Sequence, residues 1–562
     1  MKVKKCMAML LVFCLAAGSL AGCQSPEKGA DPVQKEEQGG ESTSEQETRE
    51  AKDVSNLRIG TTYANNSFNM FGQDDAFGRM NYNSFVSLNF WHFDEKGELS
   101  GSGCLFQDWE ISEDDTQLVL SYNLEGLKWH DGQPVTSEDI LFTFDFYKAQ
   151  NYPLFLSVSD VQVLEEGKLQ VTFDEPMAFS FMNQTTLMYH LMPEHIWGKV
   201  ENPAEYGGED MSIGCGPYRL VSKDADAQIS YYEAVEDFPL GELTVDKVEL
   251  HSYDNQASLI TALQNDEIDV MYGYSASLDT TLLPLIEQDE AIDLGESVNT
   301  ATYQIVFGFN QYPTKDLPFR QAVRYALDYE VLNQSITGGY GSVASQGAVS
   351  PSCVGYLDGL EENKRDLEKA EEILDEAGYR DLDGDGFREL PDGSPMDVKI
   401  ALQSATDLYK RYAEIIQLNL AEAGIRVSVD EQTISNKDYT AELRKNGSYE
   451  IYLGMTTVGI ASWTGIASYI ADVVITSGQH FGTYADEDYL KAYTAMTQAT
   501  SYEEYEEAFG EIQKMNAEDV PAVALAIMKT YYPYRTDRIT GWTNYPAWGV
   551  INVDTWYQAV EK

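Results

Sequence analysis

The length of the stretch from Val54 to Lys562 restricts how this chain can fold more than any other feature. A single hydrophobic core stops growing beyond about 250–300 residues, and longer chains divide into several domains. This stretch exceeds that limit, so we expect two to four domains. The chain contains 36 Tyr, 22 Phe and 8 Trp, which can fill such cores and still line a pocket.

The first residues of the chain have the pattern of an export signal. Three lysines among residues 2–5 precede the apolar run Cys6–Leu20, which suits a signal peptide and is shorter than the roughly 20 apolar residues of a membrane span. The run ends in Leu-Ala-Gly-Cys at Cys23, which resembles the bacterial lipobox. We therefore expect residues 1–22 to be a lipoprotein signal peptide and lipidated Cys23 to anchor the protein on the extracytoplasmic face of the cell membrane. The alternative is an ordinary cysteine after a plain secretory signal.

Residues 23–53 are predicted to be a disordered tether. Glu, Gln, Ser, Gly, Lys and Pro dominate this segment, which cannot bury enough apolar surface to offset the entropy of ordering. Such a segment would space the folded body away from the bilayer.

The charge of the chain argues against anionic partners. Lysine and arginine number 38 and aspartate and glutamate 92, so the net charge is 38 − 92 = −54. A field of this sign repels nucleic acid and favours cationic or zwitterionic solutes. The alternative is that the carboxylates only keep an exported protein soluble.

Cysteine and histidine give no pattern of a metal or catalytic centre. Beyond Cys23, the candidate mature chain has only Cys104, Cys215 and Cys353, which allow one disulfide at most and no CxxC pair. Neither HExxH nor GxSxG occurs, so we expect no enzyme and no required cofactor.

Helix and strand patterns alternate along the chain. Thr136 and Asp139 have capping-box spacing at the start of a helix, and a helix is expected from Pro318. Another follows Asp366 and stops at Gly378. The helix over 408–423 is followed by Gly424 and by a strand over 425–429, which favours an α/β fold.

Two strand regions are expected in the first part of the chain. Residues 57–63 have strand character, with Gly60 at a close backbone approach. Residues 119–124 and 127–130 are expected to be two strands joined by a turn at Gly126.

Several collinear segments resemble the bacterial extracellular solute-binding proteins of family 5, the oligopeptide, dipeptide and nickel class that serves ABC importers. Cys215 stands where the family usually has threonine, and Asp266 stands where it has glycine. The segments that carry the resemblance are 105–115 with 127–140, 213–220, 266–270, 309–310 with 317–328, and 370–379 with 383–387 and 392–393.

The resemblance implies a two-lobed periplasmic-binding-protein-like clamp (type II, cluster C), with a small α+β domain inserted in the first lobe. The implied boundaries are 54–75, 211–300 and 520–562 for lobe I, 76–210 for the inserted domain and 301–519 for lobe II.

The resemblance also implies a function and partners. The chain would be a monomer that captures short peptides or a similar small solute for the permease and ATPase of an ABC importer. The alternative is a peptide-sensing receptor that feeds no transporter.

Eight residues near strand ends, glycine-flanked loops or the family's lobe junctions are candidates for the pocket. In peptide-binding relatives, the segment equivalent to 454–472 supplies a tryptophan and an aspartate that pairs with the peptide's amino terminus. Here Trp463 is present, but the W-x-A-D-Y-x-D-P run is absent. For each aromatic candidate the alternative is plain packing. The candidates are Tyr63, Asn65, Tyr274, Ser462, Trp463, Trp542, Tyr545 and Trp548.

The run from Asp381 to Glu389 resembles the opening of a calcium-binding loop. Asp381, Asp383 and Asp385 occupy positions one, three and five, and a glycine occupies position six. Position twelve is Asp392 instead of a bidentate glutamate. The alternative is a hairpin turn in which Asp and Gly satisfy the backbone geometry.

Overall fold

The computed structural model describes residues 52–72, 76–96, 98–184, 189–273, 278–456, 470–472, 474–475, 479–480, 482–545 and 548–562. The predicted signal peptide, Cys23 and nearly all of the predicted tether lie outside these residues. The described residues belong to one compact unit, Ala51–Lys562. Among them, no helix is both long enough and apolar enough to cross a membrane.

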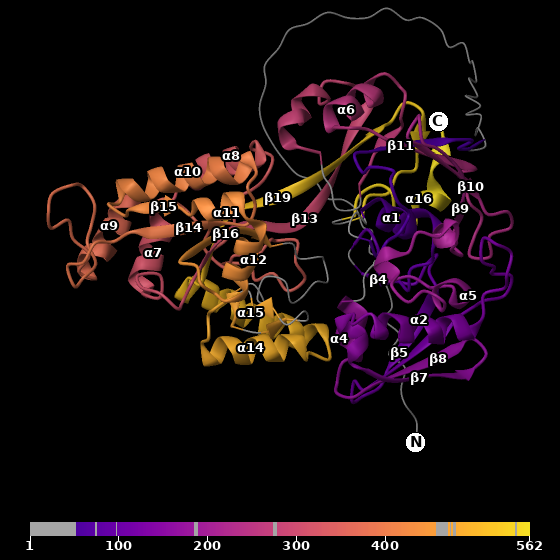
Figure 1. Cartoon of the computed structure of the whole chain (residues 1–562), viewed down its shortest axis with the longest axis horizontal. Coiled ribbons are helices and arrows are strands. Elements are labelled where there is room, and N and C mark those ends of the chain that lie inside the picture. Colours follow the sequence, from indigo (N-terminus) through magenta and orange to yellow (C-terminus); the bar gives the residue numbers. More distant parts are fainter. Residues whose placement is uncertain are drawn as a thin grey trace, which may run out of the picture. The chain divides into compact units, whose positions relative to one another are not determined.

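A mixed sheet of ten strands forms the frame of the fold (Figure 1). Its strands, in spatial order, are β15 (Val427–Val429), β14 (Val398–Leu402), β16 (Ile451–Thr456), β13 (Ile292–Phe307), β19 (Ala522–Arg535), β12 (Val270–Met271), β2 (Leu57–Thr61), β11 (Lys247–Ser252), β10 (Ile229–Ala234) and β9 (Tyr218–Asp224). The antiparallel neighbours β13 and β19 are the longest, with 16 and 14 residues.

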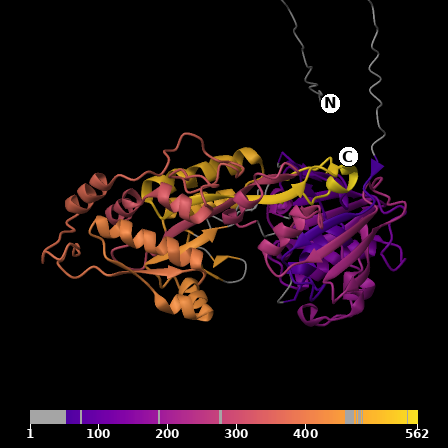
Figure 2. The same ribbon diagram turned by 90° about the horizontal axis from the view of Figure 1, so that it is seen from above.

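The two ends of the β13–β19 pair belong to different hydrophobic cores (Figure 2). Residues 292–298 of β13 pair with 529–535 of β19, and residues 302–306 pair with 522–527. Between these registers, residues 299–301 lie opposite Met528 alone. We call residues 52–298 and 529–562 lobe A, and residues 302–527 lobe B. Two cores joined by two crossing strands agree with the predicted two-lobed α/β fold.

Lobe A also contains a four-stranded antiparallel sheet, β5-β6-β8-β7. Its hydrophobic cluster runs without a break from this sheet to strands of the large sheet, including β2 and β11. The proposed boundaries of an inserted domain within this lobe stay a prediction. The described strands of lobe A outside the large sheet are β5 (Phe106–Ile111), β6 (Gln117–Tyr122), β8 (Lys168–Phe173), β7 (Val158–Glu165), β3 (His92–Phe93), β4 (Leu99–Ser100), β1 (Lys52–Asp53), β21 (Val560–Glu561) and β20 (Ile539–Thr540).

Helices cover the strands of lobe A. The α-helices are α1 (Ala76–Asn81), α2 (Ser137–Ala149), α3 (Pro153–Leu156), α4 (Ala178–Gln184), α5 (Glu194–Trp197), α6 (Gln256–Gln264) and α16 (Thr555–Gln558). The π-helix η1 (Tyr82–Val86) and the 3₁₀-helices η2 (Pro203–Glu205), η3 (Glu209–Ser212) and η4 (Thr280–Leu285) complete the set.

Most local predictions for lobe A are confirmed, and one is wrong. The capping box at Thr136 is present, because its amide donates to Asp139 Oδ2 at 2.9 Å. A Cβ on Gly60 would lie 2.4 Å from Ile268, so the backbone approach there is close. The strand expected over 127–130 is reduced to one bridge between Lys128 and Pro134. The physical reason is the tight turn at residues 129–133, where the Trp129 amide donates to the Gln133 carbonyl at 2.8 Å.

Lobe B is a helical layer on strands β14 to β16 and on the ends of β13 and β19 (Figure 1). The predicted order of helix, Gly424 and strand is confirmed as α10 followed by β15. The helices are α7 (Leu317–Ala326), α8 (Tyr329–Thr337), α9 (Leu367–Glu376), α10 (Asp407–Glu422), α11 (Glu431–Ser435), α12 (Lys437–Lys445), α14 (Glu487–Thr497) and α15 (Tyr502–Asp519). Strands β17 (Val474–Ile475) and β18 (Gln479–His480) form a separate pair.

Two arginines of α7 hold the carboxyl end of α15. Arg320 donates to the carbonyls of Asp519 and Val520, at 2.8 and 3.1 Å, and Arg324 donates to that of Ala517 at 2.6 Å. Cations at a helix carboxyl end satisfy its unpaired carbonyls and oppose its dipole. The position of α15 in lobe B is therefore well defined.

Candidate functional site

The candidate site is built on the lobe A end of the crossing strands. Residues 542–545 and 548 carry three of the predicted pocket aromatics, and Asn544 and Tyr545 are bonded to β13 there. Ser297 of β13 donates from its hydroxyl to the Tyr545 carbonyl at 2.8 Å, and Asn544 donates its side-chain amide to the Glu296 carbonyl. This C-terminal segment is thereby fixed to a strand that passes between the lobes.

Tyr545 is a buried member of this segment. Only 2% of it is exposed, and its ring stacks on His92 with centroids 5.3 Å apart and planes 7° apart. Burial, and next to it the charge of Asp554, raises the pKa of Tyr545 above its usual range. Burial also lowers the pKa of His92, so the stacked pair is neutral at pH 7. Tyr545 therefore packs as a core residue.

The two tryptophans of the segment are half-buried. Trp542 donates from Nε1 to the Arg535 carbonyl at 3.3 Å, and its ring lies 5.2 Å from that of Tyr534. Trp548 closes a turn on Tyr545 through its backbone amide at 3.1 Å. Because a half-buried indole keeps surface that a solute can cover, the tryptophans are better pocket candidates than Tyr545.

Tyr63 and Asn65 follow strand β2 and differ in surroundings. Asn65 is 1% exposed and donates from Nδ2 to Ser230 Oγ at 2.8 Å, inside lobe A. Tyr63 is half-buried and lies close enough to Tyr532 to contribute to the raised pKa of that phenol, which burial raises most. A Cβ on Gly549 would clash with the Tyr532 ring at 2.3 Å, so the turn that follows Trp548 packs closely on Tyr532.

Three predicted residues, Tyr274, Ser462 and Trp463, lie outside the described residues. Near the end of β16, which is described, the Gln403 side chain accepts from the Met455 amide at 2.6 Å. Gln304 of β13 is 1% exposed, and its Oε1 has no hydrogen-bond partner among the residues that the structure describes. Sequence reasoning missed Gln304, although a polar residue within the apolar run Tyr303–Phe307 was a usable signal.

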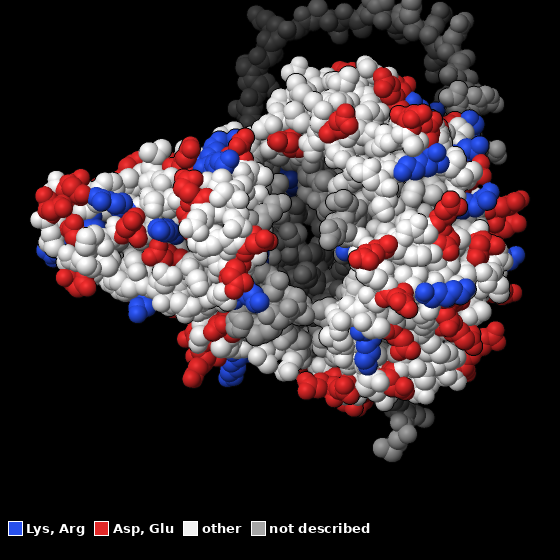
Figure 3. All heavy atoms as spheres, viewed as in Figure 1, with Lys and Arg blue, Asp and Glu red and all other residues white. Residues whose placement is uncertain are grey.

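A hollow and a cavity lie where lobes A and B face each other. Figure 3 shows a hollow in one face, with acidic and basic side chains on its rim. A separate cavity of about 640 Å³ opens beside α8. No predicted site residue lines this cavity, so it adds nothing to the candidate set. Its lining residues are Thr281, Glu330, Val331, Gln334, Ser335, Gly338 and Arg411.

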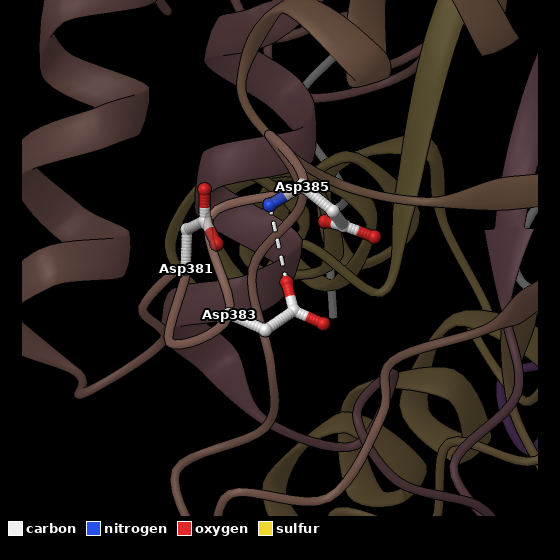
Figure 4. Close-up of side chains that lie close together, drawn as sticks. All are labelled: Asp381, Asp383 and Asp385. Atoms are coloured by element: carbon white, nitrogen blue, oxygen red, sulfur yellow. Dashed lines mark hydrogen bonds between the residues drawn. The ribbon is translucent and has the colours of Figure 1, made fainter.

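The three aspartates of the predicted calcium turn lie together on the surface of lobe B (Figure 4). One oxygen from each lies within 4.8 Å of the others. Asp381 accepts from the amides of Gly384 and Gly386, at 2.6 and 3.0 Å, and Asp383 accepts from the Asp385 amide at 3.1 Å. These contacts are those of a turn stabilised by its own side chains.

This turn offers fewer oxygen ligands than a calcium ion usually binds. Calcium binds about six to eight oxygens, and no fourth acidic side chain joins the group among the described residues. Asp392, at the predicted twelfth position, instead accepts from Ser394 at 2.9 Å. Asp385 is also paired with Arg426. The side chains described here fit a turn better than a complete calcium site.

Comparison with known proteins gives a match over most of the chain. Residues 102–468 match the model described as "Bacterial extracellular solute-binding proteins, family 5 Middle". A Brucella ovis protein named as an ABC transporter peptide-binding protein is 27% identical over 362 residues. That alignment covers 61% of this chain and 62% of the relative's length. The dipeptide-binding protein of Escherichia coli is 20% identical over 456 residues, 77% of this chain and 82% of its own.

A solved structure shares the fold. The periplasmic oligopeptide-binding protein of a Thermotoga maritima ABC transporter, solved with bound mannohexaose, superposes with a TM-score of 0.69. The superposition covers 90% of this chain and 99% of the Thermotoga chain at 20% identity. This likeness confirms the predicted two-lobed α/β fold.

Proposed function

Because the chain belongs to the bacterial extracellular solute-binding proteins of family 5, we propose that it captures a small solute between lobes A and B and delivers it to an ABC importer. The observation that carries this proposal is the single pair of long strands, β13 and β19, that joins two separate cores. Two bodies joined in this way can close on a guest by bending at the crossing, and closure expels water from the guest.

Short peptides are the proposed cargo. The names of the Brucella and Escherichia coli relatives support this class. The mannohexaose in the Thermotoga protein makes oligosaccharides the class to test beside them. Half-buried aromatic residues such as Trp548 suit both, since indole rings pack on apolar side chains and on sugar faces.

We further propose that lipid on Cys23 holds the protein at the extracytoplasmic face of the membrane. The apolar run and the lipobox-like residues before Cys23 support this. Replacement of Cys23 by alanine should release the protein from membranes into the medium or the periplasm. Membrane fractionation of cells that express the two forms measures this, and an unchanged membrane fraction would contradict the anchor.

The proposed monomeric state and the proposed partners need separate measurements. Light scattering gives the mass of the purified chain, and a dimer would contradict a monomer. Co-purification with the permease and ATPase from detergent-solubilised membranes, in the presence of solute, tests delivery to an importer.

Calorimetric titration with defined peptides, oligosaccharides and metal chelates tests capture itself. We expect micromolar binding of a peptide. No heat from any class would contradict the proposed function.

A pair of tryptophan variants tests the place of binding. We expect Trp548→Ala to weaken binding about 10-fold or more, because buried aromatic contacts dominate small interfaces. Trp109→Ala is the matched control. Trp109 is a half-buried tryptophan of lobe A that lies in β5 of the four-stranded sheet, and its ring packs on that of Trp91. This control variant should leave the dissociation constant unchanged, and equal effects of the two variants would remove Trp548 from the site.

A further inference from the structure

Away from the β13–β19 crossing, lobes A and B also meet through side chains of α4 and α15. The amino-terminal end of α15 meets α4. The hydroxyl of Tyr502, the first residue of α15, donates to Asn183 Oδ1 at 2.6 Å. The ring of Phe179 meets the Tyr502 ring edge-on, with centroids 5.0 Å apart and planes at 83°. This contact involves no backbone crossing, unlike the β13–β19 pair.

Phe179 belongs to the core of the opposite lobe. It is 8% exposed and is part of a hydrophobic cluster that also contains Tyr505, Phe509 and Val306 of lobe B. An aromatic side chain carried by lobe A thus packs against a cluster whose other buried members belong to lobe B. Separation of the lobes at this point would expose that ring to water, which is unfavourable in proportion to the apolar area uncovered.

The lobe A side of the contact is held by hydrogen bonds within lobe A. Asn183 donates from Nδ2 to the Phe179 carbonyl at 2.9 Å, which turns its Oδ1 toward Tyr502. Asp115 accepts from the Phe179 amide at 2.8 Å, and the Asp115 carbonyl accepts from the Ala178 amide at 3.0 Å. The first turn of α4 is therefore fixed within lobe A.

The lobe B side is also fixed. Ser501 caps α15 by accepting from the Glu504 amide at 3.3 Å, and Glu504 accepts in return from the Thr500 amide at 2.9 Å. Such reciprocal caps define the start of a helix. Tyr502 therefore meets Asn183 from a defined position, and little side-chain entropy is lost when the contact forms.

We propose that Tyr502, Asn183 and Phe179 form a latch that holds lobes A and B closed and thereby sets the affinity for the solute between them. The inference rests on the proposed function for its consequence, since only a clamp has a closed state to stabilise. A bend at the β13–β19 crossing that separates α4 from α15 breaks this contact. Loss of the latch lowers the fraction of closed protein, and the apparent dissociation constant rises in the same proportion.

Three variants of the full chain test the latch. Tyr502→Phe removes the hydrogen bond and keeps the ring, and Phe179→Leu removes the ring contact and keeps an apolar side chain. Tyr489→Phe is the matched control, because the Tyr489 hydroxyl donates to Asn516 Oδ1 at 3.2 Å entirely within lobe B.

Small-angle X-ray scattering without solute measures closure directly. We expect a larger radius of gyration for Tyr502→Phe and Phe179→Leu than for the wild type and Tyr489→Phe. Scattering curves that coincide for all four proteins would overturn the latch.

Calorimetric titration then measures the consequence for affinity. We expect about 3- to 10-fold weaker solute binding for Tyr502→Phe, from the usual value of one hydrogen bond, and wild-type affinity for Tyr489→Phe. Equal affinities for Tyr502→Phe and wild type would overturn the effect on binding. The scattering comparison uses no solute, so its outcome is separate from a failure of the proposed function, which would appear as absence of binding in the wild type.

Discussion

Asp269 in lobe A and the turn 381–385 in lobe B place the same carboxyl group in opposite surroundings. The Asp269 side chain is fully buried and accepts from Arg58 at 2.7 Å and from Arg538 at 2.8 Å. The three turn aspartates are exposed and accept from backbone amides of their own loop. Burial separates a carboxylate on which a fold depends from carboxylates that only shape a turn.

Some of the many carboxylates of this strongly acidic chain have a structural role. Asp269 links β12 to β2 and to the C-terminal segment, and the turn aspartates bond to their own loop and, through Asp385, to Arg426. Both groups have structural partners, and neither includes a residue of the predicted pocket. Acidity alone is therefore a poor guide to the solute site, which we propose lies at the lobe junction.

The largest expected effect is that of Asp269→Ala on stability. It leaves two arginines without their buried partner, and breaking a buried pair in this way costs about 3–5 kcal/mol. Urea unfolding followed by fluorescence measures the loss of unfolding free energy. A loss of less than about 1 kcal/mol would contradict the assigned difference between the two regions.

The second effect is a pH dependence of the Asp269 contribution. Burial alone would raise the pKa of Asp269, but hydrogen bonds from Arg538 and Arg58 outweigh it and hold the pKa below its usual range. A lowered pKa in the folded state stabilises the protein above the unfolded carboxyl pKa of about 4, and this stabilisation is lost as the pH falls through the folded value.

Unfolding midpoints of the wild type and Asp269→Asn, measured from pH 7 down to pH 3, check this dependence. We expect the difference between them to be constant from pH 7 to about 5 and to shrink below about 4. A difference that stays constant to pH 3 would show that the charge of Asp269 adds no pH-dependent stability to the folded protein.

A smaller effect is expected for Asp381→Ala in the turn. The variant loses two hydrogen bonds to exposed amides that water can replace, so we expect a cost of about 1 kcal/mol or less. The same urea experiment measures it beside Asp269→Ala. Equal losses for the two variants would erase the contrast between the regions.

The smallest effect is expected from calcium. Because the described donors do not complete a calcium site, addition of millimolar Ca²⁺ or of EGTA should leave the melting temperature unchanged. A calcium-dependent rise that disappears in Asp381→Ala would establish a calcium site at this turn.

Local features could be predicted from the sequence because they depend on residues a few positions apart. Thr136 and Asp139 form the expected capping box, and Asp366 caps α9 through the Lys369 amide. The strand predicted over 127–130 is wrong because the pattern of these four residues does not show how soon the chain turns back. The turn at Gly132 leaves room for only one bridge, between Lys128 and Pro134.

The candidate site could be predicted only in part, because its residues meet through the fold. No periodicity relates Tyr532 to Gly549, which pack closely in lobe A. Burial likewise could not be predicted, so Tyr545 and Trp548 were equivalent in the sequence and differ in the structure. The contact between Asn183 and Tyr502 spans 319 positions and has no local signal.

The most direct test of two lobes that close on a solute is small-angle scattering of the wild-type chain with and without a saturating ligand found by calorimetry. We predict a smaller radius of gyration in the presence of the ligand, because bending at the β13–β19 crossing brings the lobes together. A bound protein whose scattering is identical to that of the free protein would contradict closure of lobes A and B on the solute.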